Sequence, residues 1–416
     1  MQKKGNSWSW VPSLYFAEGL PYVIVMTVSV IMYKDLGISN ADIAFFTSWL
    51  YLPWVIKPFW SPVVDLLKTK RWWIIAMQYL IGCGLAGVAY LIPTSHFFQS
   101  SLAILWLMAF SSATHDIAAD GFYMIAQSEK EQSLFVGIRN IFYRIAMVFG
   151  QGVLVTGAGF LTRYYSTPKA WLIVFLISGG LVVILSLYHW YILPNPQEEK
   201  SESQKNITNL LLTFFKKKEI GCILAYILLY RFGEAQLVKI ASPFLMEDRE
   251  LGGLGLSVEN VGVVYGTIGV IALLTGGLLG GWAISNGGLK KWLWPMLIAM
   301  NAPNLVYVFM AIFQPQNIFI ISSFVAIEQL GYGFGFTAFT LYLIYVSQGE
   351  FKTSHYAICT GLMALGMMIP GMFAGYLQEQ WGYSLFFIWV CICTIPAFII
   401  ANFLKIDDSF GKKGNN

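Results

Sequence analysis

Residues 194–219 read PNPQEEKSESQKNITNLLLTFFKKKE and form the one long polar interval in a chain of 416 residues. The chain as a whole is 57% hydrophobic and 12% charged, whereas soluble domains carry about 25% charged residues. A membrane-spanning helix needs about 20 apolar residues, so each side of the interval has room for six spans. The apolar runs lack strand-type alternation, which excludes a β-barrel. We therefore expect an all-α membrane protein and exclude a water-soluble enzyme.

Apolar runs between charged or Pro/Gly-rich breaks predict twelve spans in two sets of six. They lie near residues 10–33, 41–63, 72–92, 98–127, 134–160, 168–193, 220–246, 256–284, 292–313, 317–347, 354–378 and 381–404. The expected organisation is an N-terminal six-helix half at 1–193, a cytoplasmic linker at 194–219 and a C-terminal six-helix half at 220–416. The first span contains FAEG at 16–19 and the seventh contains FGEA at 232–235, which favours a duplicated transporter fold.

The positions of Lys and Arg predict the orientation of the spans. With twelve spans and both termini in the cytoplasm, the basic clusters at 68–71 and 216–218 lie inside. The few basic residues left outside are Lys34, Arg163, Lys169 and Arg249. One missed or extra helix would destroy this asymmetry, so it supports the predicted topology.

Charge and cysteine placement exclude several classes of protein. The net charge of +4 is spread along the chain, with no basic block beyond 216–218, so no nucleic-acid partner is expected. The five cysteines lie in apolar runs without a CxxC pair, which indicates neither disulfides nor a metal site. The start, MQKKGNSWSW, leads into an apolar run without a cleavage site, so we interpret it as the first span and not as a signal peptide.

Ionisable residues inside the spans predict a polar pathway. Inserting each of them into the membrane at a helix centre costs a free energy of at least about 2.5–3.5 kcal/mol, so they are expected to face a cavity or a partner and not lipid. They are Glu18 in the first span, His115, Asp116 and Asp120 in the fourth, Arg139 and Arg144 in the fifth, Arg231, Glu234 and Lys239 in the seventh, and Glu328 in the tenth. The third, sixth, ninth and twelfth spans carry essentially none. In the major facilitator fold the first, fourth, seventh and tenth helices line a central cavity, and this distribution favours a transporter over a channel or receptor.

The carboxyl groups of the first half are the candidates for proton coupling. Asp116 and Asp120 share one helical face, and two like charges in a low dielectric favour protonation of one of them. The alternative is a salt bridge with Arg139 or Arg144, which we favour for Asp120, while we favour the proton-coupling role for Asp116. Glu18, beside helix-loosening Gly and Pro residues, is a further proton-coupling candidate or else a protonated structural residue.

The second half supplies candidates for substrate binding and gating. Arg231 and Glu234 are three residues apart and are expected to pair, although Glu234 is also a proton-coupling candidate. Lys239 lacks an intrahelical partner and is expected to bind an anionic group of the substrate. Glu328 and Gln329 are expected to contact substrate, and the following Gly331 and Gly333 to form a gate or else a close helix contact.

The second span ends in KPFWSPVVD at 57–65. Asp65 is expected to accept hydrogen bonds at the start of the eleventh helix and so latch the two halves, with a solvated loop residue as the alternative. We group Lys57 and Arg139 with it as gating residues. His115 is expected to contact substrate or to serve as a simple hydrogen bonder, whereas the other histidines lie near span ends and receive no role.

Five segments, in order, resemble those of the AmpG-type muropeptide permeases, in the acetyl-CoA transporter-like branch of the major facilitator superfamily. They are YFAEGLP at 15–21, KPFWSPVVD at 57–65, SATHDIAAD at 112–120, YRIAM at 143–147 and LYRFGE at 229–234. Two departures are that His115 replaces the Gln of the family and that Glu18 stands where relatives carry a small residue.

The resemblance implies proton-driven import, by alternating access, of N-acetylglucosaminyl anhydro-N-acetylmuramic acid with or without its peptide. It implies a monomer in the bacterial inner membrane, in contact with lipid and protons and without a cofactor. Lys239, Arg144 and Gln236 would bind carboxylates and sugar hydroxyls, and Tyr22, Trp49 or Trp54 would stack on sugar rings. Another sugar or an acyl-CoA are the open alternatives. A membrane-embedded transferase is less favoured, because no nucleophile set or metal set is visible.

Overall fold

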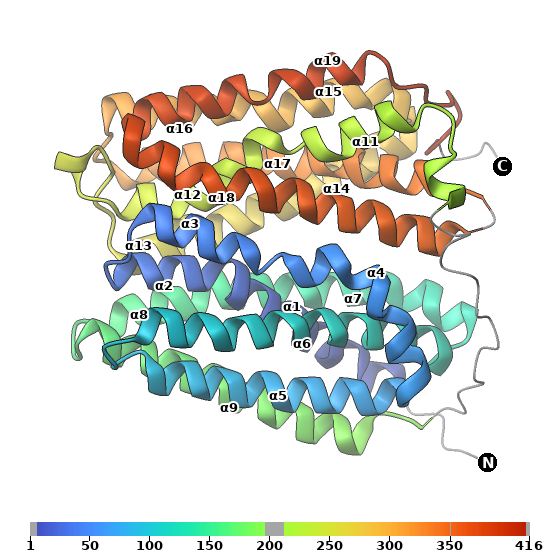
Figure 1. Cartoon of the computed structure of the whole chain (residues 1–416), viewed down its shortest axis with the longest axis horizontal. Helices are drawn as coiled ribbons and strands as arrows, with labels where there is room; N and C mark the ends of the chain where they lie inside the picture. Colours follow the sequence, from blue (N-terminus) through green and yellow to red (C-terminus); the bar gives the residue numbers. More distant parts are fainter. Residues whose placement is uncertain (1–5, 196–211, 350, 413–416) are drawn as a thin grey trace. The chain divides into compact units, whose positions relative to one another are not determined.

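The computed structural model describes residues 6–195, 212–349 and 351–412, and over these ranges the chain is helical without a strand (Figure 1). The helices of the first part are α1 Val11–Val23, α2 Ser29–Asp35, α3 Asn40–Trp49, α4 Leu52–Leu67, α5 Lys70–Leu91, α6 Phe97–Ala126, α7 Glu129–Val148, α8 Val155–Leu161 and α9 Thr167–Ile192. Those of the second part are α11 Ile220–Leu229, α12 Phe232–Met246, α13 Val258–Val261, α14 Val270–Gly287, α15 Leu289–Asn301, α16 Leu305–Phe313, α17 Ile318–Val346, α18 Lys352–Ile392 and α19 Ile395–Ala401.

Ten helical stretches within the described ranges are long and apolar enough to cross a membrane. The stretch Ser354–Ala401 has 48 residues, but its backbone leaves helical geometry at Gly382, where φ is 72°. Gly tolerates this conformation, and the break divides the stretch into two crossings. α3 and α4, separated by a turn at Leu50 and Tyr51, supply the crossing predicted near 41–63. The predicted all-α fold is confirmed, and the described helices account for twelve crossings.

Several crossings are interrupted by wider helical turns. Pro21 lies inside α1, where its ring removes a backbone donor, and a π-helical turn follows at Ile24–Val28. Similar turns occur at Phe149–Leu154, between α7 and α8, and at Gly262–Gly269, between α13 and α14. Such turns are often found at functional sites in helical proteins.

The chain forms two compact units, and three of their boundaries, at 55/56, 257/258 and 262/263, fall inside predicted spans. Unit 1 comprises Met1–Ile38, Ile56–Glu202 and Val258–Gly262, and unit 2 comprises Ser39–Val55, Ser203–Ser257 and Val263–Asn416. In unit 1, α5 packs against α6 and lies beside α9 (Figure 1). In unit 2, α14 packs against α17, and both α3 and α12 pack against α18. Most of 194–219 lies outside the described residues, so its role as a linker stays a prediction.

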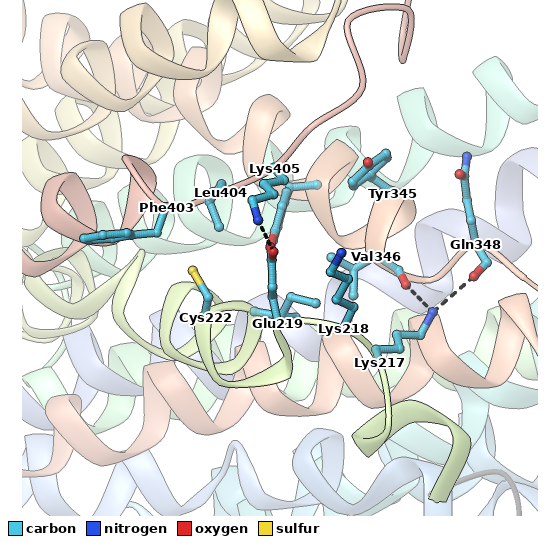
Figure 2. A pocket seen from close by; sticks show the side chains of 12 residues that line it. Lys217, Lys218, Glu219, Cys222, Tyr345, Val346, Gln348, Phe403, Leu404 and Lys405 are labelled. Carbon is cyan, nitrogen blue, oxygen red and sulfur yellow. Dashed lines mark hydrogen bonds and ion pairs between the residues drawn. The ribbon is translucent and has the colours of Figure 1, made fainter.

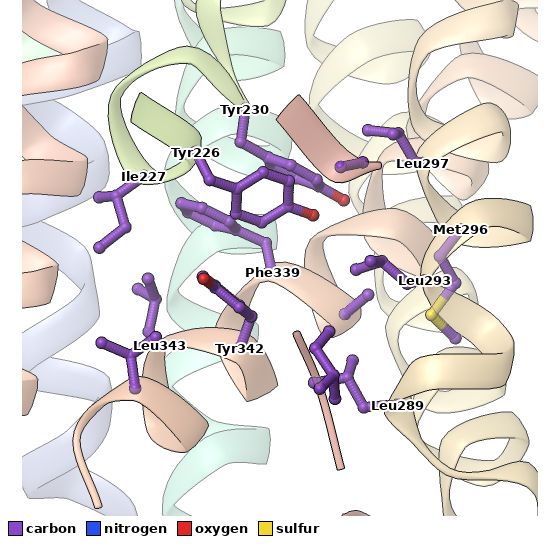
Figure 3. Close-up of a cluster of buried hydrophobic side chains, with 14 of the residues drawn as sticks. Tyr226, Ile227, Tyr230, Leu289, Leu293, Met296, Leu297, Phe339, Tyr342 and Leu343 are labelled. Atoms are coloured by element: carbon purple, nitrogen blue, oxygen red, sulfur yellow. The ribbon is translucent and has the colours of Figure 1, made fainter. Parts of the chain in front are cut away.

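The core of unit 2 is aromatic where α11 meets α17 (Figure 3). The ring of Tyr230 stacks on Phe339 with centroids 4.5 Å apart and planes 3° apart. The Tyr230 hydroxyl donates to the Gly335 carbonyl over 2.9 Å, which satisfies the polar end of an otherwise buried ring. This stacking fixes the start of the seventh crossing against the tenth.

The glycines of α17 allow neighbouring helices to approach closely. A Cβ atom at Gly331 would lie 2.1 Å from the Ala299 carbonyl oxygen of α15. One at Gly333 would lie 2.0 Å from the Leu273 carbonyl oxygen of α14. Both distances are far shorter than a van der Waals contact, so these positions serve helix packing. Their role in a gate stays a prediction.

Gly333→Ala is expected to lower the free energy of unfolding by about 1–3 kcal/mol, because α14 and α17 must move apart. Gly281→Ala on α14 is the matched control, since a Cβ there meets nothing within 4 Å. Thermal unfolding of the purified variants in detergent measures the difference. Equal melting temperatures for the two variants would contradict the packing role.

Candidate functional site

Unit 1 contains a partly buried cluster of two carboxyl groups and one amine, formed by Glu18 of α1, Lys57 of α4 and Asp116 of α6. We call it the carboxyl cluster. The Lys57 ammonium forms an ion pair with Asp116 Oδ2, and both side chains are about a quarter exposed, at 26% and 25%. Glu18 is 8% exposed, and its carboxyl group lies close to that of Asp116. The second oxygen of Glu18 has no hydrogen-bond partner among the described residues.

A hydrogen bond between two carboxyl groups requires a proton on one of them, because two carboxylates offer only acceptors. Lys57 neutralises Asp116, so a proton shared by the two carboxyl groups would belong on Glu18. The sequence singled out all three residues, but it placed Lys57 in a gate and did not pair it with Asp116.

Asp120 lies one turn further along α6 and has different partners. Arg139 of α7 pairs with Asp120 Oδ1 over 3.1 Å, so the salt bridge favoured from the sequence is present. The Tyr15 hydroxyl donates to the same oxygen over 3.3 Å and accepts from Arg139 over 3.0 Å. The guanidinium also lies 4.7 Å from the Tyr15 ring centroid. Asp120 is therefore held by Arg139 and Tyr15, whereas Asp116 is paired with Lys57 and lies close to Glu18.

A second polar network in unit 1 contains residues that the sequence analysis did not assign. His115, 1% exposed, lies 2.9 Å from the Gln78 amide nitrogen, and the Gln78 carbonyl oxygen lies 2.8 Å from His189 Nδ1. His189 Nε2 lies 3.0 Å from the Ser13 hydroxyl. The network joins α6, α5, α9 and α1. Gln78 is uncharged and was missed by a search for ionisable residues, and His189 was set aside because of its position near a helix end.

In unit 2 the expected pair of Arg231 and Glu234 is present. Arg231 Nε donates to Glu234 Oε2 over 3.0 Å, and both side chains are buried. Arg231 also donates to the Tyr332 hydroxyl over 2.6 Å and lies 5.0 Å from the ring centroid of Phe336. Glu234 Oε1 has no hydrogen-bond partner within the described part of the chain. The pair therefore links α12 to α17 and leaves one carboxylate oxygen unpaired.

Arg231→Met is expected to lower the free energy of unfolding by about 3–5 kcal/mol, because it leaves a buried carboxylate without its cation. The double variant Arg231→Met/Glu234→Gln removes both charges and is expected to recover most of this loss. Thermal unfolding of both variants measures the effect. A double variant no more stable than the single one would contradict the charge argument.

Lys239 of α12 is a buried cation without an acidic partner among the described residues. Its side chain is 2% exposed, and its ammonium donates to the Thr47 hydroxyl of α3 over 2.8 Å. It also lies 5.3 Å from the ring centroid of Tyr51. A hydroxyl and an aromatic face compensate a buried charge only in part, so this site favours an additional anionic group.

Glu328 of α17 is a buried carboxyl group surrounded by neutral donors. It is 2% exposed, and its Oε2 accepts from the Gln329 amide over 2.9 Å and from the Tyr307 hydroxyl over 3.5 Å. Gln329 is thus bonded to its own neighbour in the chain. The substrate-contact role of both residues stays a prediction.

Two of the other predicted substrate-binding residues, Gln236 and Arg144, have hydrogen-bond partners within the protein. The Gln236 amide is engaged on both sides, accepting from the Trp389 indole over 2.9 Å and donating to the Phe232 carbonyl over 3.1 Å. Arg144 is half-buried and donates to the Met147 sulfur over 3.4 Å. Tyr22, Trp49 and Trp54 are half-buried. The side chain of Asp65 lies outside the described residues.

The sequence profile of the Major Facilitator Superfamily matches residues 13–350. The "Putative transporter AmpG 4" of Rickettsia conorii is 27% identical over 94% of this chain and 95% of that protein. The "Anhydromuropeptide permease" of Escherichia coli strain K12 is 26% identical over 95% of this chain and 81% of that protein.

Solved structures with the same fold include membrane transporters of low sequence similarity. A crystal structure of the nucleoside transporter NupG superposes with a TM-score of 0.71 at 15% identity and covers 96% of this chain and 99% of that one. The crystal structure of a D-xylose-proton symporter gives a TM-score of 0.70 at 12% identity. It covers 98% of this chain and 99% of that one. These similarities establish the fold alone.

Proposed function

Since the chain belongs to the Major Facilitator Superfamily, we propose that it is a proton-coupled importer of peptidoglycan turnover products. The family and the permease-named relatives make the chain a transporter and not an enzyme. The cargo we propose is N-acetylglucosaminyl anhydro-N-acetylmuramic acid, with or without its peptide. The names of the relatives, over nearly the whole chain, support this cargo.

The observation that carries proton coupling is the carboxyl cluster of Glu18, Lys57 and Asp116. Because Lys57 neutralises Asp116, a proton shared by the two carboxyl groups would reside on Glu18. A substrate-dependent rearrangement that moves Lys57 away from Asp116 leaves the Asp116 carboxylate without its cation, which favours the binding of a further proton by the two carboxyl groups. Proton occupancy and the position of α4 are thereby linked, which is the requirement for coupling.

Lys239 supports an anionic cargo. The lactyl group of peptide-free anhydro-N-acetylmuramic acid carries a carboxylate, and in the peptide-bearing form, where this group is an amide, the peptide supplies carboxylates instead. A buried ammonium held by one hydroxyl and one ring gains from such a partner. Arg144, half-buried and bonded to a methionine sulfur, is the corresponding cation that we propose in unit 1.

The proposed location is the bacterial inner membrane, with the chain acting as a monomer and both termini in the cytoplasm. The basic clusters at 68–71 and 216–218 support this orientation through the positive-inside rule. Substrate and protons would then move inward together as the cavity opens to each side in turn.

Uptake of labelled anhydro-disaccharide into proteoliposomes tests the proposal. With the outside more acidic by about one pH unit, we expect about tenfold accumulation for each coupled proton, and its collapse on adding a protonophore. Accumulation that ignores the pH gradient would contradict proton coupling. A tenfold excess of unlabelled acyl-CoA or of an unrelated sugar is the control for cargo, and displacement by either would reassign the substrate.

A further inference from the structure

Unit 2 contains a pocket of about 360 Å³ at the ends of three helices (Figure 2). It lies where α11 begins at Ile220, where α17 ends at Val346 and just beyond the end of α19 at Ala401. We call it the basic pocket. None of the residues assigned to substrate or proton binding lines it.

The charged wall of the basic pocket carries three lysines and one carboxylate: Lys217, Lys218, Lys405 and Glu219. Lys405 pairs with Glu219 over 2.5 Å. Lys217 donates to the Val346 and Gln348 carbonyls over 2.7 Å and 3.1 Å, which fixes its ammonium at the C-terminal end of α17 (Figure 2). The four side chains together leave an excess of positive charge in the pocket.

Neither Lys217 nor Lys218 is paired with an acidic side chain in the described part of the chain. Burial lowers the pKa of Lys217, because carbonyl dipoles replace only part of its hydration. Lys218 is exposed and extends from the loop that precedes α11. A ligand with negative charge would therefore meet two ammonium groups that no carboxylate already neutralises.

The opposite wall of the basic pocket is apolar. Cys222 and Ile223 lie in the first turn of α11, and Phe403 and Leu404 follow α19. The Phe403 side chain is 66% exposed, although it adjoins a helix long and apolar enough to cross a membrane. A basic wall facing an apolar one at helix ends matches the boundary between lipid headgroups and acyl chains.

We propose that the basic pocket binds the phosphate group of an anionic phospholipid, with Lys217 and Lys218 on the headgroup and Phe403 along the start of an acyl chain. The assignment to the cytoplasmic leaflet rests on the predicted orientation, which places Lys217 and Lys218 inside. It is independent of the transported substrate. A soluble phosphate shares the headgroup chemistry but would leave the apolar wall uncovered, so the lipid makes use of both walls.

The test uses the full chain, purified in detergent and freed of native lipid. Phosphatidylglycerol, phosphatidylcholine or inorganic phosphate is titrated, and bound lipid is counted by native mass spectrometry. We expect phosphatidylglycerol to bind and phosphatidylcholine to bind far more weakly. Lys218→Gln should weaken phosphatidylglycerol binding about fivefold, and Lys217→Gln/Lys218→Gln about twenty-fivefold, since each surface lysine adds about the same electrostatic increment.

The matched control is Lys291→Gln/Lys412→Gln, which removes two exposed lysines that lie on the same predicted side of the membrane but do not line the pocket. It should bind phosphatidylglycerol as the unaltered chain does. Equal binding of the two lipids, or equal weakening by the control, would overturn the proposal. Displacement of the lipid by millimolar inorganic phosphate would assign the pocket to soluble phosphate and overturn the lipid assignment. Lys218→Gln alone changes an exposed side chain and keeps the test valid if the double variant misfolds.

Discussion

Asp116→Asn is expected to abolish the accumulation of substrate against its gradient. The unaltered chain should concentrate the disaccharide about tenfold per coupled proton at a gradient of about one pH unit, whereas the variant should reach a ratio of about one. In the variant, Lys57 loses its counter-ion and becomes the partner of Glu18, which then holds its charge throughout the cycle. Counterflow exchange of labelled for unlabelled substrate, which needs no net proton movement, should persist.

Asp120→Asn is the comparison that separates the two carboxylates of α6. Asp120 is already held by Arg139 and Tyr15, so its loss should lower stability but leave accumulation dependent on the pH gradient. If Asp116→Asn accumulates substrate as the unaltered chain does, the carboxyl cluster has no part in coupling. If only Asp120→Asn loses the dependence of accumulation on the pH gradient, the proton-coupling residue is Asp120 and not Asp116.

Lys239→Met is expected to weaken transport and to stabilise the fold. Loss of one charge-assisted contact of about 1.5–3 kcal/mol raises the apparent KM for the disaccharide about ten- to hundredfold. Removing a 2% exposed ammonium without an acidic partner should raise the free energy of unfolding by about 1–3 kcal/mol. Concentration-dependent uptake and thermal unfolding measure the two effects on the same preparation.

The substrate itself provides the control for Lys239. A methyl ester of the muramic carboxylate lacks the negative charge, so the unaltered chain and Lys239→Met should transport it with similar apparent KM. Thr47→Val removes the hydroxyl bonded to Lys239 but keeps the ammonium. It should destabilise the chain while preserving the preference for the charged substrate. A Lys239→Met variant that loses both substrates equally would indicate a structural role alone.

The fold could be predicted because a bilayer imposes its thickness and charge asymmetry on the sequence. Apolar runs indicated the crossings, and the break between the last two lies at Gly382, close to the boundary between the predicted spans. The division of the second crossing into α3 and α4 was not predicted, since hydropathy is continuous across Leu50 and Tyr51. The sequence also did not predict that α3 belongs to unit 2. This membership depends on contacts with residues far along the chain, such as the hydrogen bond between Asn40 and Gln378, 338 residues later.

Contacts within one helix were predicted better than contacts between helices. Arg231 and Glu234 pair as their spacing requires. The pair of Lys57 and Asp116 joins different helices, and the rotation of α4 about its axis cannot be derived from its closely spaced prolines and aromatics. Gln78 was missed because the sequence analysis searched for ionisable residues and its side chain is a neutral amide. In the structure this amide connects two buried histidines.

The N-terminal end of α3 acquires its final hydrogen-bond partners only late in synthesis of the chain. The Asn40 side chain donates to Gln378 and to Tyr383 over 2.6 Å and 2.9 Å, and these partners follow it by 338 and 343 residues. At a synthesis rate of about 5–20 residues per second, the ribosome needs about 20–70 s to supply them. During that interval a nascent membrane segment carries an amide whose final acceptors do not yet exist.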